Sequence, residues 1–398
     1  MSNQSKKNIL FVINNLNAGG AENALVSLLQ EFDYSRYEVD LLLMKQHGLF
    51  LNKLPGQVNL LPAPEEFLFF DMPIKNALLK SLSSLRLDLF FGRLRYSLFS
   101  RNEKIATRRE QKLWLCMKKS MPAQKKKYHA AIGYLENIPN CYIVDKTNAD
   151  IKIGFIRNDY DKLGMDPNYD KQYFKKLTAL LTVSESCENI LRNHFGDLPI
   201  QIGTMQSVFS PNTIKSLAAE NVELDFSGNT IISVGRLYPQ KGFDLAIDAC
   251  ALLRDKGIDV KWYVIGDGAL KEELVQRIKD RELETNFFFI GQRENPYAYL
   301  QKATIYAQTS RFEGKSRATE EAKILAKPIL VTNFPTVLDQ IEHLKTGYIV
   351  DLDAESIAKG IVELLNNISL THQLTNNLKS YIPDNDKELN IMYNILNK

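Results

Sequence analysis

The sequence predicts an α/β protein made of two doubly wound units, each a parallel sheet wrapped by helices. The chain has 398 residues, more than one hydrophobic core usually supports. Short apolar runs alternate with segments of helical periodicity. This alternation stops at residues 206–229, which carry Pro211 and Gly228, and then starts again. The hydrophobic fraction of 44% and the charged fraction of 24% are typical of folded soluble proteins.

The first unit opens with an apolar run at residues 8–14, a turn with Gly19 and Gly20, and a helical pattern at 21–32. A strand, a glycine turn and a helix in this order are the opening of a nucleotide-binding α/β unit. Further strands are expected at 38–44, 130–134, 151–156 and 177–184. Polar or helical segments separate them, as in a parallel sheet covered by helices.

The second unit alternates strands and helices over most of its length. Its expected strands are 230–234, 260–265, 287–290, 305–308 and 329–332, and its expected helices are 242–256, 270–280, 295–303, 318–326 and 354–366. Such regular alternation predicts a doubly wound domain. The tail at 381–398 is expected to form one more helix, which returns toward the N-terminal domain.

Residues 75–127 interrupt the first unit with a strongly basic segment. It contains 15 Lys or Arg residues and three acidic residues, a net charge of +12, interleaved with Leu and Phe. We expect amphipathic helices with a basic face, which an anionic membrane would attract by about 1 kcal/mol per nearby cation. The alternative is a basic helical insertion that is only solvated. No nucleic-acid reader motif accompanies the segment, so we expect no nucleic-acid partner.

The first 15 residues are too polar for a signal peptide or a spanning helix, so we expect a cytoplasmic protein, peripheral on the inner face of the cell membrane. Four scattered Cys residues show no metal-ligand spacing and suit a reducing compartment. Two Asp-x-Asp pairs also occur. The pair of Asp351 and Asp353 fits the N-cap region of the next helix, and the pair of Asp159 and Asp161 lacks a third oxygen ligand. We therefore expect no metal.

Gly19 and Gly20 are the first candidate site residues. Glycines between a strand and a helix let backbone N–H groups approach a phosphate, although an ordinary turn would use the same residues. The turn is not G-x-G-x-x-G, and the second strand ends in Met44 and Lys45 rather than in an acid. These two departures argue against NAD.

The second candidate is the segment SVGRLYPQKGFD at residues 233–244. Arg236 and Lys241 follow a strand end and precede a helix, the place where open α/β sheets bind ligands. Two cations there would neutralise a diphosphate, although a basic surface loop would look the same. Gly235 and Gly242 lie on either side of the two cations, and their lack of side chains leaves space around the backbone there.

The third candidate is the segment at residues 309–333. Glu313 lies in a loop after a strand, and Glu321 lies eight residues later in the following helix. Two such carboxylates can accept hydrogen bonds from the hydroxyl groups of one ligand. Between them, the amides of residues 315–317 open a helix and would cap a leaving phosphate.

These motifs occur in one order: the glycine turn, V-G-R-L with a Lys five residues after the Arg, G-D-G at 266–268, and two Glu residues separated by seven. In this order they resemble the family 4 retaining glycosyltransferases of the GT-B fold, over almost the whole chain except the basic segment. The resemblance implies two Rossmann-like domains that face each other across a cleft. Residues 1–206, with the insertion at about 75–127, would form the acceptor domain and residues 207–380 the nucleotide-sugar donor domain.

The resemblance also implies a role for each motif residue. Arg236 and Lys241 would hold the donor pyrophosphate, and Glu321 the ribose. Glu313 would contact hydroxyl groups of the donor sugar. The implied catalytic residues are Arg236, Lys241 and Glu313, and the implied donor-binding residues are Gly19, Gly20, Arg236, Lys241, Lys315, Ser316, Arg317 and Glu321.

Three positions depart from the family pattern. Arg157 stands where a His is usual, so that Arg157 or Asp159 would act on the acceptor side. Ser207 replaces a usual Asn, and Lys315 replaces a usual apolar residue.

The sequence therefore predicts a hexosyltransferase that moves a sugar from a nucleotide donor, expected to be a UDP-sugar, to a glycan or lipid-linked acceptor in cell-surface polysaccharide synthesis. No other cofactor is expected. The alternative is a noncatalytic GT-B subunit that binds glycan or activates a partner glycosyltransferase. A nucleotide-sugar epimerase or hydrolase on the same fold is a second alternative.

Overall fold

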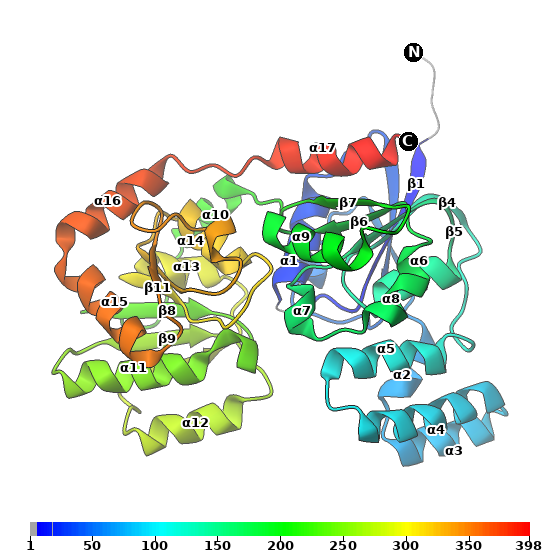
Figure 1. Ribbon diagram of the computed structural model, residues 1–398, viewed down its shortest axis with the longest axis horizontal. Helices are drawn as coiled ribbons and strands as arrows, with labels where there is room; N and C mark the ends of the chain where they lie inside the picture. Colours follow the sequence, from blue (N-terminus) through cyan, green and yellow to red (C-terminus); the bar gives the residue numbers. More distant parts are fainter. Residues whose placement is uncertain (1–5, 18) are drawn as a thin grey trace. The chain divides into compact units, whose positions relative to one another are not determined.

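The computed structural model describes residues 6–17 and 19–398, which fold into two compact units (Figure 1). Unit 1 contains the described residues up to Asn17, the range Ala21–Val208 and the C-terminal range Asn385–Lys398. Unit 2 contains Gly19, Gly20 and Phe209–Asp384.

Unit 1 is built on a seven-stranded sheet in the order β3-β2-β1-β4-β5-β6-β7, with every pair parallel. The strands are β1 (Lys7–Ile13), β2 (Tyr37–Leu43), β3 (Val58–Leu61), β4 (Lys127–Gly133), β5 (Asn148–Phe155), β6 (Ala179–Thr182) and β7 (Gln201–Thr204). Alternate residues of β1 enter two different cores, with Leu10 in one and Phe11 in the other. A strand buried on both faces has to be apolar throughout, which explains the run ILFVI.

Helices cover both faces of this sheet (Figure 1). They are α1 (Gly20–Gln30), α2 (Glu65–Asp71), α3 (Ile74–Ser83), α4 (Leu87–Asn102), α5 (Ala106–Met117), α6 (Ile138–Lys146), α7 (Tyr160–Leu163), α8 (Pro167–Phe174), α9 (Glu185–Phe195) and α17 (Asn385–Leu396), with a short 3₁₀ helix at Leu51–Lys53. Helix α17 closes unit 1 from the far end of the chain. Its Met392 is buried in the core around Phe11, and the ring of Tyr393 stacks on Tyr37 at 5.8 Å between centroids.

Unit 2 is built on a six-stranded parallel sheet in the order β10-β9-β8-β11-β12-β13. Its strands are β8 (Thr230–Val234), β9 (Lys261–Ile265), β10 (Phe287–Gly291), β11 (Ile305–Gln308), β12 (Ile329–Thr332) and β13 (Tyr348–Val350). Its helices are α10 (Pro211–Ala218), α11 (Phe243–Asp255), α12 (Lys271–Asp280), α13 (Pro296–Lys302), α14 (Arg317–Ile324), α15 (Ala354–Asn366) and α16 (Ile368–Lys379), with 3₁₀ helices at Pro239–Lys241 and Val337–Asp339.

The expected α/β class and the expected strands of the second unit are confirmed to within about a residue. In the second unit the sequence reading missed β13, α10 and α16; in the first unit it missed β3 and β7 and gave no residue ranges for α2 or for α6 to α9. Each missed strand is only three or four residues long and forms the edge of a sheet. It therefore has too few buried positions to produce a recognisable apolar run in the sequence.

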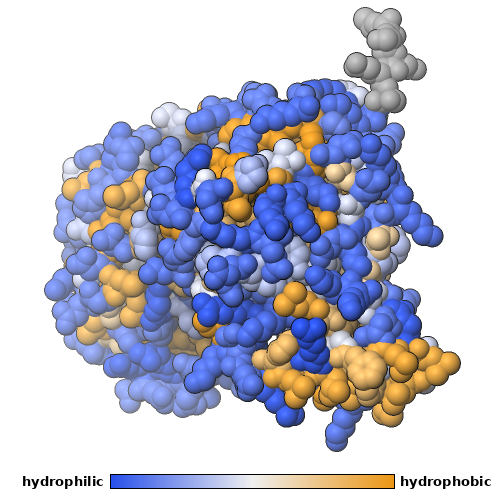
Figure 2. Space-filling view, turned by 45° about the vertical axis from the view of Figure 1, so that its right-hand side comes forward, coloured by the Kyte–Doolittle hydropathy of each residue, from blue (hydrophilic) through white to orange (hydrophobic). Residues whose placement is uncertain are grey.

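The basic segment forms α3, α4 and α5, which pack against one another in sequence order. Large apolar side chains are exposed on these helices: Leu79 68%, Leu82 52%, Leu87 57%, Phe91 62% and Leu98 58%. Figure 2 shows hydrophobic side chains gathered at the lower right, over α3 and α4. The exposed face is therefore apolar as well as basic. No helix in the described part of the chain is long and apolar enough to cross a membrane.

Candidate functional site

The loops after β8 and β11 meet at the centre of the second sheet. These two strands are neighbours, and the chain leaves β8 toward β9 on one side and reaches β11 on the other. The order therefore reverses between them, which makes this the switch point of the sheet. Open α/β sheets bind ligands outside the carboxyl ends of their strands at such a point.

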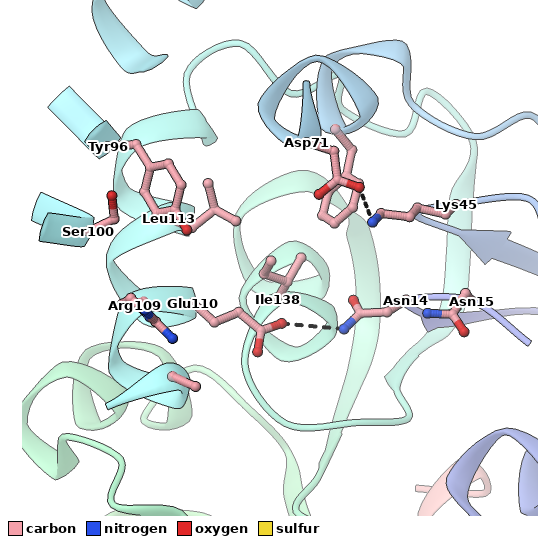
Figure 3. Close-up of a pocket in the computed structure, with 12 residues that line it drawn as sticks. Asn14, Asn15, Lys45, Asp71, Tyr96, Ser100, Arg109, Glu110, Leu113 and Ile138 are labelled. Carbon is pink, nitrogen blue, oxygen red and sulfur yellow. Dashed lines mark hydrogen bonds and ion pairs between the residues drawn. The ribbon is translucent and has the colours of Figure 1, made fainter. Parts of the chain in front are cut away.

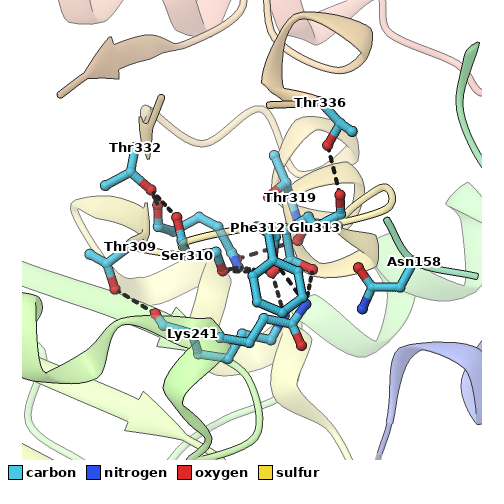
Figure 4. A network of polar contacts seen from close by, with 12 residues as sticks. Asn158, Lys241, Thr309, Ser310, Phe312, Glu313, Thr319, Thr332 and Thr336 are labelled. Atoms are coloured by element: carbon cyan, nitrogen blue, oxygen red, sulfur yellow. Dashed lines mark hydrogen bonds and ion pairs between the residues drawn. The ribbon is translucent and has the colours of Figure 1, made fainter. Parts of the chain in front are cut away.

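Lys241 and Glu313 come from these two loops and form a direct ion pair. The Lys241 Nζ lies 2.5 Å from Glu313 Oε1, and the two side chains are 16% and 7% exposed. Ser310 Oγ donates to the same oxygen at 2.5 Å and Gln308 Nε2 at 2.9 Å, as Figure 4 shows for the network. Gln240 Nε2 donates to the other oxygen, Oε2, at 3.4 Å, so four side chains fix the orientation of the Glu313 carboxylate.

Glycine permits the close approach of the two loops. Gly242 has φ of +63°, and a Cβ at this position would lie 2.1 Å from the backbone oxygen of Thr309. Thr309 Oγ1 donates to the Lys241 carbonyl at 3.0 Å. Arg311 adds a two-pronged contact to Asp244, at 2.8 and 2.6 Å. Any larger residue at position 242 would push the Lys241 loop away from the loop that carries Glu313.

Arg236 lies on the same loop as Lys241, but its side chain is exposed. Its guanidinium carbon lies 5.5 Å from the centre of the Tyr238 ring. The G-D-G segment supports the backbone here, because the Leu237 N–H donates to the Asp267 carbonyl and a Cβ at Gly268 would lie 2.6 Å from the Leu237 oxygen. The exposed cation therefore stands on a fixed loop.

Glu321 lies inside unit 2 and is 4% exposed. Arg317 Nε donates to it at 3.1 Å and the Tyr297 hydroxyl at 3.2 Å. Burial raises the pKa of Glu321, while the Arg317 cation opposes this rise. Arg317 also lies over the Phe209 ring, 4.2 Å from its centre. Glu321 and Arg317 therefore form a second, buried ion pair beside the first.

The start of α14 joins the two pairs. Ser316 caps the helix through Thr319 N–H and donates from its hydroxyl to Gln308 Oε1 at 3.3 Å. Its own backbone N–H donates to Gln340 Oε1 at 3.1 Å. Lys315 lies 3.8 Å from Glu320 Oε1, measured from its Nζ. The amide of Ser316 is thus already hydrogen-bonded in this structure.

The sequence reading missed several polar residues of this network, namely Gln240, Gln308, Ser310, Thr332, Thr336 and Gln340. Gln308 and Ser310 carried a detectable signal, because the apolar run of β11 ends in three consecutive polar residues, Gln308, Thr309 and Ser310. Gln340 carried none, since only the folding of its loop over α14 brings it to Ser316.

In unit 1, the two departures from the family pattern contact each other. Arg157 Nη2 donates to Ser207 Oγ at 2.8 Å, and the Arg157 guanidinium lies 4.7 Å from the centre of the Tyr134 ring. Asp159 is 2% exposed and caps α7 by accepting from the Lys162 N–H at 3.0 Å.

Gly20 is the first residue of α1, and the backbone contacts of Gly19 and Gly20 assign both to unit 2. Their expected contact with a donor stays a prediction. Asp353 caps α15 by accepting from the Ser356 N–H at 2.8 Å, which confirms its expected structural role. Among the described residues, no three His, Cys, Asp or Glu side chains gather in a group that would hold a metal ion.

Known proteins resemble the chain in sequence and in fold. Residues 218–381 match the family model described as "Glycosyl transferases group 1". The poly(ribitol-phosphate) alpha-N-acetylglucosaminyltransferase of Staphylococcus aureus is 25% identical over 197 residues, 48% of this chain and 38% of that protein. The N-acetylgalactosamine-N,N'-diacetylbacillosaminyl-diphospho-undecaprenol 4-alpha-N-acetylgalactosaminyltransferase of Campylobacter jejuni is 25% identical over 380 residues, 94% of each chain.

Among solved structures, S. aureus TarM bound to fondaparinux, alpha-GlcNAc-glycerol and UDP superimposes with a TM-score of 0.69 at 17% identity, covering 98% of this chain and 100% of that one. The predicted GT-B fold is thereby confirmed. Together the matches support a glycosyltransferase, with the clearest family match in the part of the chain that carries the Lys241 and Glu313 loops.

Proposed function

We propose that this protein is a retaining glycosyltransferase that moves a sugar from a UDP-sugar to a glycan or lipid-linked acceptor in cell-surface polysaccharide synthesis. The observation that carries the proposal is the Lys241 and Glu313 pair at the switch point of the second sheet. The similarity to TarM, whose structure contains UDP, supports the choice of donor. The similarity to an enzyme named for a diphospho-undecaprenol substrate supports a lipid-linked acceptor.

In this proposal the donor diphosphate lies between Arg236 and Lys241. The exposed Arg236 meets the phosphates with its planar fork, and Lys241 adds a point charge. Glu313 holds Lys241 in place and accepts hydrogen bonds from sugar hydroxyl groups. Glu321 holds the ribose, and the loop with Lys315, Ser316 and Arg317 covers the phosphates.

The chemistry then requires no protein nucleophile. The acceptor hydroxyl attacks the anomeric carbon on the face from which the diphosphate leaves, and a diphosphate oxygen takes the hydroxyl proton. The cations stabilise the charge that develops on the leaving group. The names of both relatives describe alpha-linked products, and an alpha linkage made from an alpha-configured UDP-sugar retains the configuration.

The helices of the basic segment bind the inner face of the cell membrane in this proposal. Along α4 the exposed residues Leu87, Phe91, Leu94 and Leu98 are spaced by three or four positions, so they form one stripe. Exposed Arg95 and Arg101 flank the stripe. Apolar side chains that enter the acyl boundary beside cations at the headgroups are the pattern of an interfacial helix on anionic lipid.

Binding of a nucleotide panel, followed by thermal unfolding, tests the donor. UDP should raise the melting temperature, since a ligand that binds only the folded state stabilises it. Preference for GDP or ADP would refute the choice of base, and no effect of any nucleotide would refute the donor site.

Arg236→Ala tests the role of the cation without disturbing the fold, because this side chain is exposed. We expect turnover to fall by a factor of roughly 10² or more, on the scale of losing one charge-stabilising donor. Lys256→Ala, an exposed Lys after α11, is the matched control and should be unchanged. Equal turnover in both variants would contradict the assignment.

The second candidate is a noncatalytic GT-B subunit. It is favoured by Arg157, which stands where the family usually has a His and whose guanidinium donates a hydrogen bond to Ser207. Donor hydrolysis by the isolated protein separates the two. The enzyme releases UDP from UDP-sugar over time, whereas the subunit binds UDP-sugar and releases none.

A further inference from the structure

The first residue at the start of α14 is held by one side chain from another loop, that of Gln340. The amide of Gln340 forms two hydrogen bonds to the main chain of Ser316, the residue that caps the helix. The Ser316 N–H donates to Gln340 Oε1 at 3.1 Å, and Gln340 Nε2 donates to the Ser316 carbonyl at 2.6 Å. Two residues of an antiparallel sheet exchange hydrogen bonds in the same way. We call this double contact the Gln340 clamp.

Charged neighbours fix the Gln340 side chain in turn. Gln340 Nε2 also donates to Glu320 Oε1 at 3.0 Å, and the Tyr381 hydroxyl donates to the other Glu320 oxygen. Lys323 Nζ donates to the Gln340 main-chain carbonyl at 3.2 Å. Gln340, Ser316 and Glu320 are 6%, 4% and 3% exposed. Because the reversed amide would lose all three hydrogen bonds, the clamp has one arrangement.

The clamped residue is connected to the carboxylate of Glu313. The Ser316 hydroxyl donates to Gln308 Oε1 at 3.3 Å, and Gln308 Nε2 donates to Glu313 Oε1 at 2.9 Å. Thr336, on the same loop as Gln340, donates from its hydroxyl to the Glu313 carbonyl at 2.8 Å. The loop after β12 therefore holds both ends of the segment from Glu313 to Ser316.

We propose that Gln340 is a positioning residue for the donor. The clamp keeps the segment from Glu313 to Ser316 in the one conformation that meets the diphosphate and the sugar. In this proposal the Ser316 N–H serves the clamp and not the phosphate, because buried polar groups keep their partners. The role in donor binding rests on the proposed function, whereas the clamp itself does not.

The same contact occurs in unit 1 and supplies a matched control. The N–H of Asp166, which caps α8, donates to Gln111 Oε1 at 3.1 Å, and Gln111 Nε2 donates to the Asp166 carbonyl at 3.3 Å. Gln111 Nε2 also donates to Asp170 Oδ2 at 2.9 Å. Asp170 lies four residues after its cap, as Glu320 lies four residues after Ser316. Gln111 is 2% exposed, so the two Gln residues match in burial as well as in contacts.

Isothermal titration calorimetry with UDP on the full chain tests the proposal. Gln340→Leu removes the clamp, and Gln111→Leu removes the equivalent contact in unit 1. Gln340→Asn and Gln111→Asn are milder changes, for use if a Leu variant does not fold. Each keeps an amide but shortens the side chain by one methylene, so that it no longer reaches both main-chain groups of the cap.

We expect the Kd for UDP to rise about tenfold in the Gln340 variants, which is the scale of one to two neutral hydrogen bonds. It should stay within about twofold in the Gln111 variants. Urea unfolding of each variant separates positioning from folding. A variant that is about 90% folded loses only about a tenth of its affinity through the unfolded fraction.

Hydrogen exchange measured by mass spectrometry reports on the clamp without a ligand. Peptides that contain Ser316 should exchange faster in the Gln340 variants than in the unmodified protein. Equal exchange refutes the clamp.

An unchanged Kd in a well-folded Gln340 variant, or an equal rise in the Gln111 variant, overturns the positioning role. If the unmodified protein does not bind UDP, the proposed donor site is refuted and the role of Gln340 falls with it. The unmodified protein thus distinguishes the two failures.

Discussion

Glu110→Gln should change how the stability of unit 1 depends on pH. The pKa of Glu110 is raised from 4.5 to about 7, chiefly by burial; the amide of Asn137 opposes the rise, the nearby Glu136 adds to it, and the amide of Asn14 also opposes it. Glu110 lines a cavity of about 490 Å³ in unit 1 (Figure 3), and the other charged or titratable groups that line it are Lys45, Asp71, Arg109 and Tyr96. The folded protein therefore holds a proton on Glu110 that the unfolded chain releases near pH 4.5.

A raised carboxyl pKa stabilises the folded state at low pH. This contribution is complete below the unfolded pKa of 4.5 and is lost as the pH rises through the folded pKa of about 7. At 1.36 kcal/mol per pKa unit, the shift corresponds to about 3 kcal/mol. That figure is an upper bound, because the cavity leaves part of the Glu110 surface open to solvent. Gln does not titrate, so the variant should lose none of this stability.

Urea unfolding at about pH 4 and about pH 8 measures the effect. Trp114 lies on α5, beside Glu110, and its fluorescence reports on unit 1. The second Trp of the chain, Trp262, is replaced by Phe in both proteins. Asp170, whose pKa burial raises to about 7, titrates in the same window in both proteins and cancels.

The test uses the difference between two pH values, so a hydrogen bond lost in the variant also cancels. We expect Glu110→Gln to gain about 1–3 kcal/mol relative to the parent between the two pH values. A change within about 0.5 kcal/mol, or a change of opposite sign, would refute the burial of a protonated Glu110.

Two further predictions test the donor loop and the membrane surface. Gly242→Ala places a Cβ 2.1 Å from the Thr309 oxygen at φ of +63°, so it should destabilise unit 2 by about 3 kcal/mol or more and weaken UDP binding. The control Gly257→Ala, at φ of +71° with no atom within 4 Å of the added Cβ, should lower the free energy of unfolding by only about 1–2 kcal/mol. Similar falls in melting temperature for the two variants would contradict the clash at position 242. Replacing both Phe91 and Leu98 by Ser should reduce co-sedimentation with anionic vesicles about tenfold or more while UDP binding stays intact; undiminished co-sedimentation would exclude insertion of this stripe.

The strands and the loops that follow them could be predicted because their signals are local. The apolar run at β8 and the glycines around Lys241 are visible in about a dozen consecutive residues. The same holds for the cap at Asp353, whose partner Ser356 lies three residues away. Short strands such as β13 were missed because three residues give no period.

The partners of the candidate site residues could not be predicted in the same way. The sequence placed Lys241 near a phosphate and Glu313 near a sugar, but it did not indicate that the two side chains bind each other across 72 residues. Arg157 and Ser207 were noticed separately as departures, and only the fold brings them into one hydrogen bond across 50 residues. Such contacts depend on which strands are neighbours, and local periodicity carries no information about strand order.

The sequence by itself determined the α/β class, the two units, the loops that carry Arg236, Lys241 and Glu313, and the helix that carries Glu321, because helix and strand periodicity and turn chemistry depend on neighbouring residues. Only the tertiary structure decided that Glu110 belongs to a cavity. The residue looks like one more charge on a basic helix until the fold brings the loops after β1 and β4 to α5, where Asn14 and Asn137 donate to its carboxyl and leave it only partly exposed. Burial depends on residues far apart in the chain, and burial changes the chemistry of a carboxyl group.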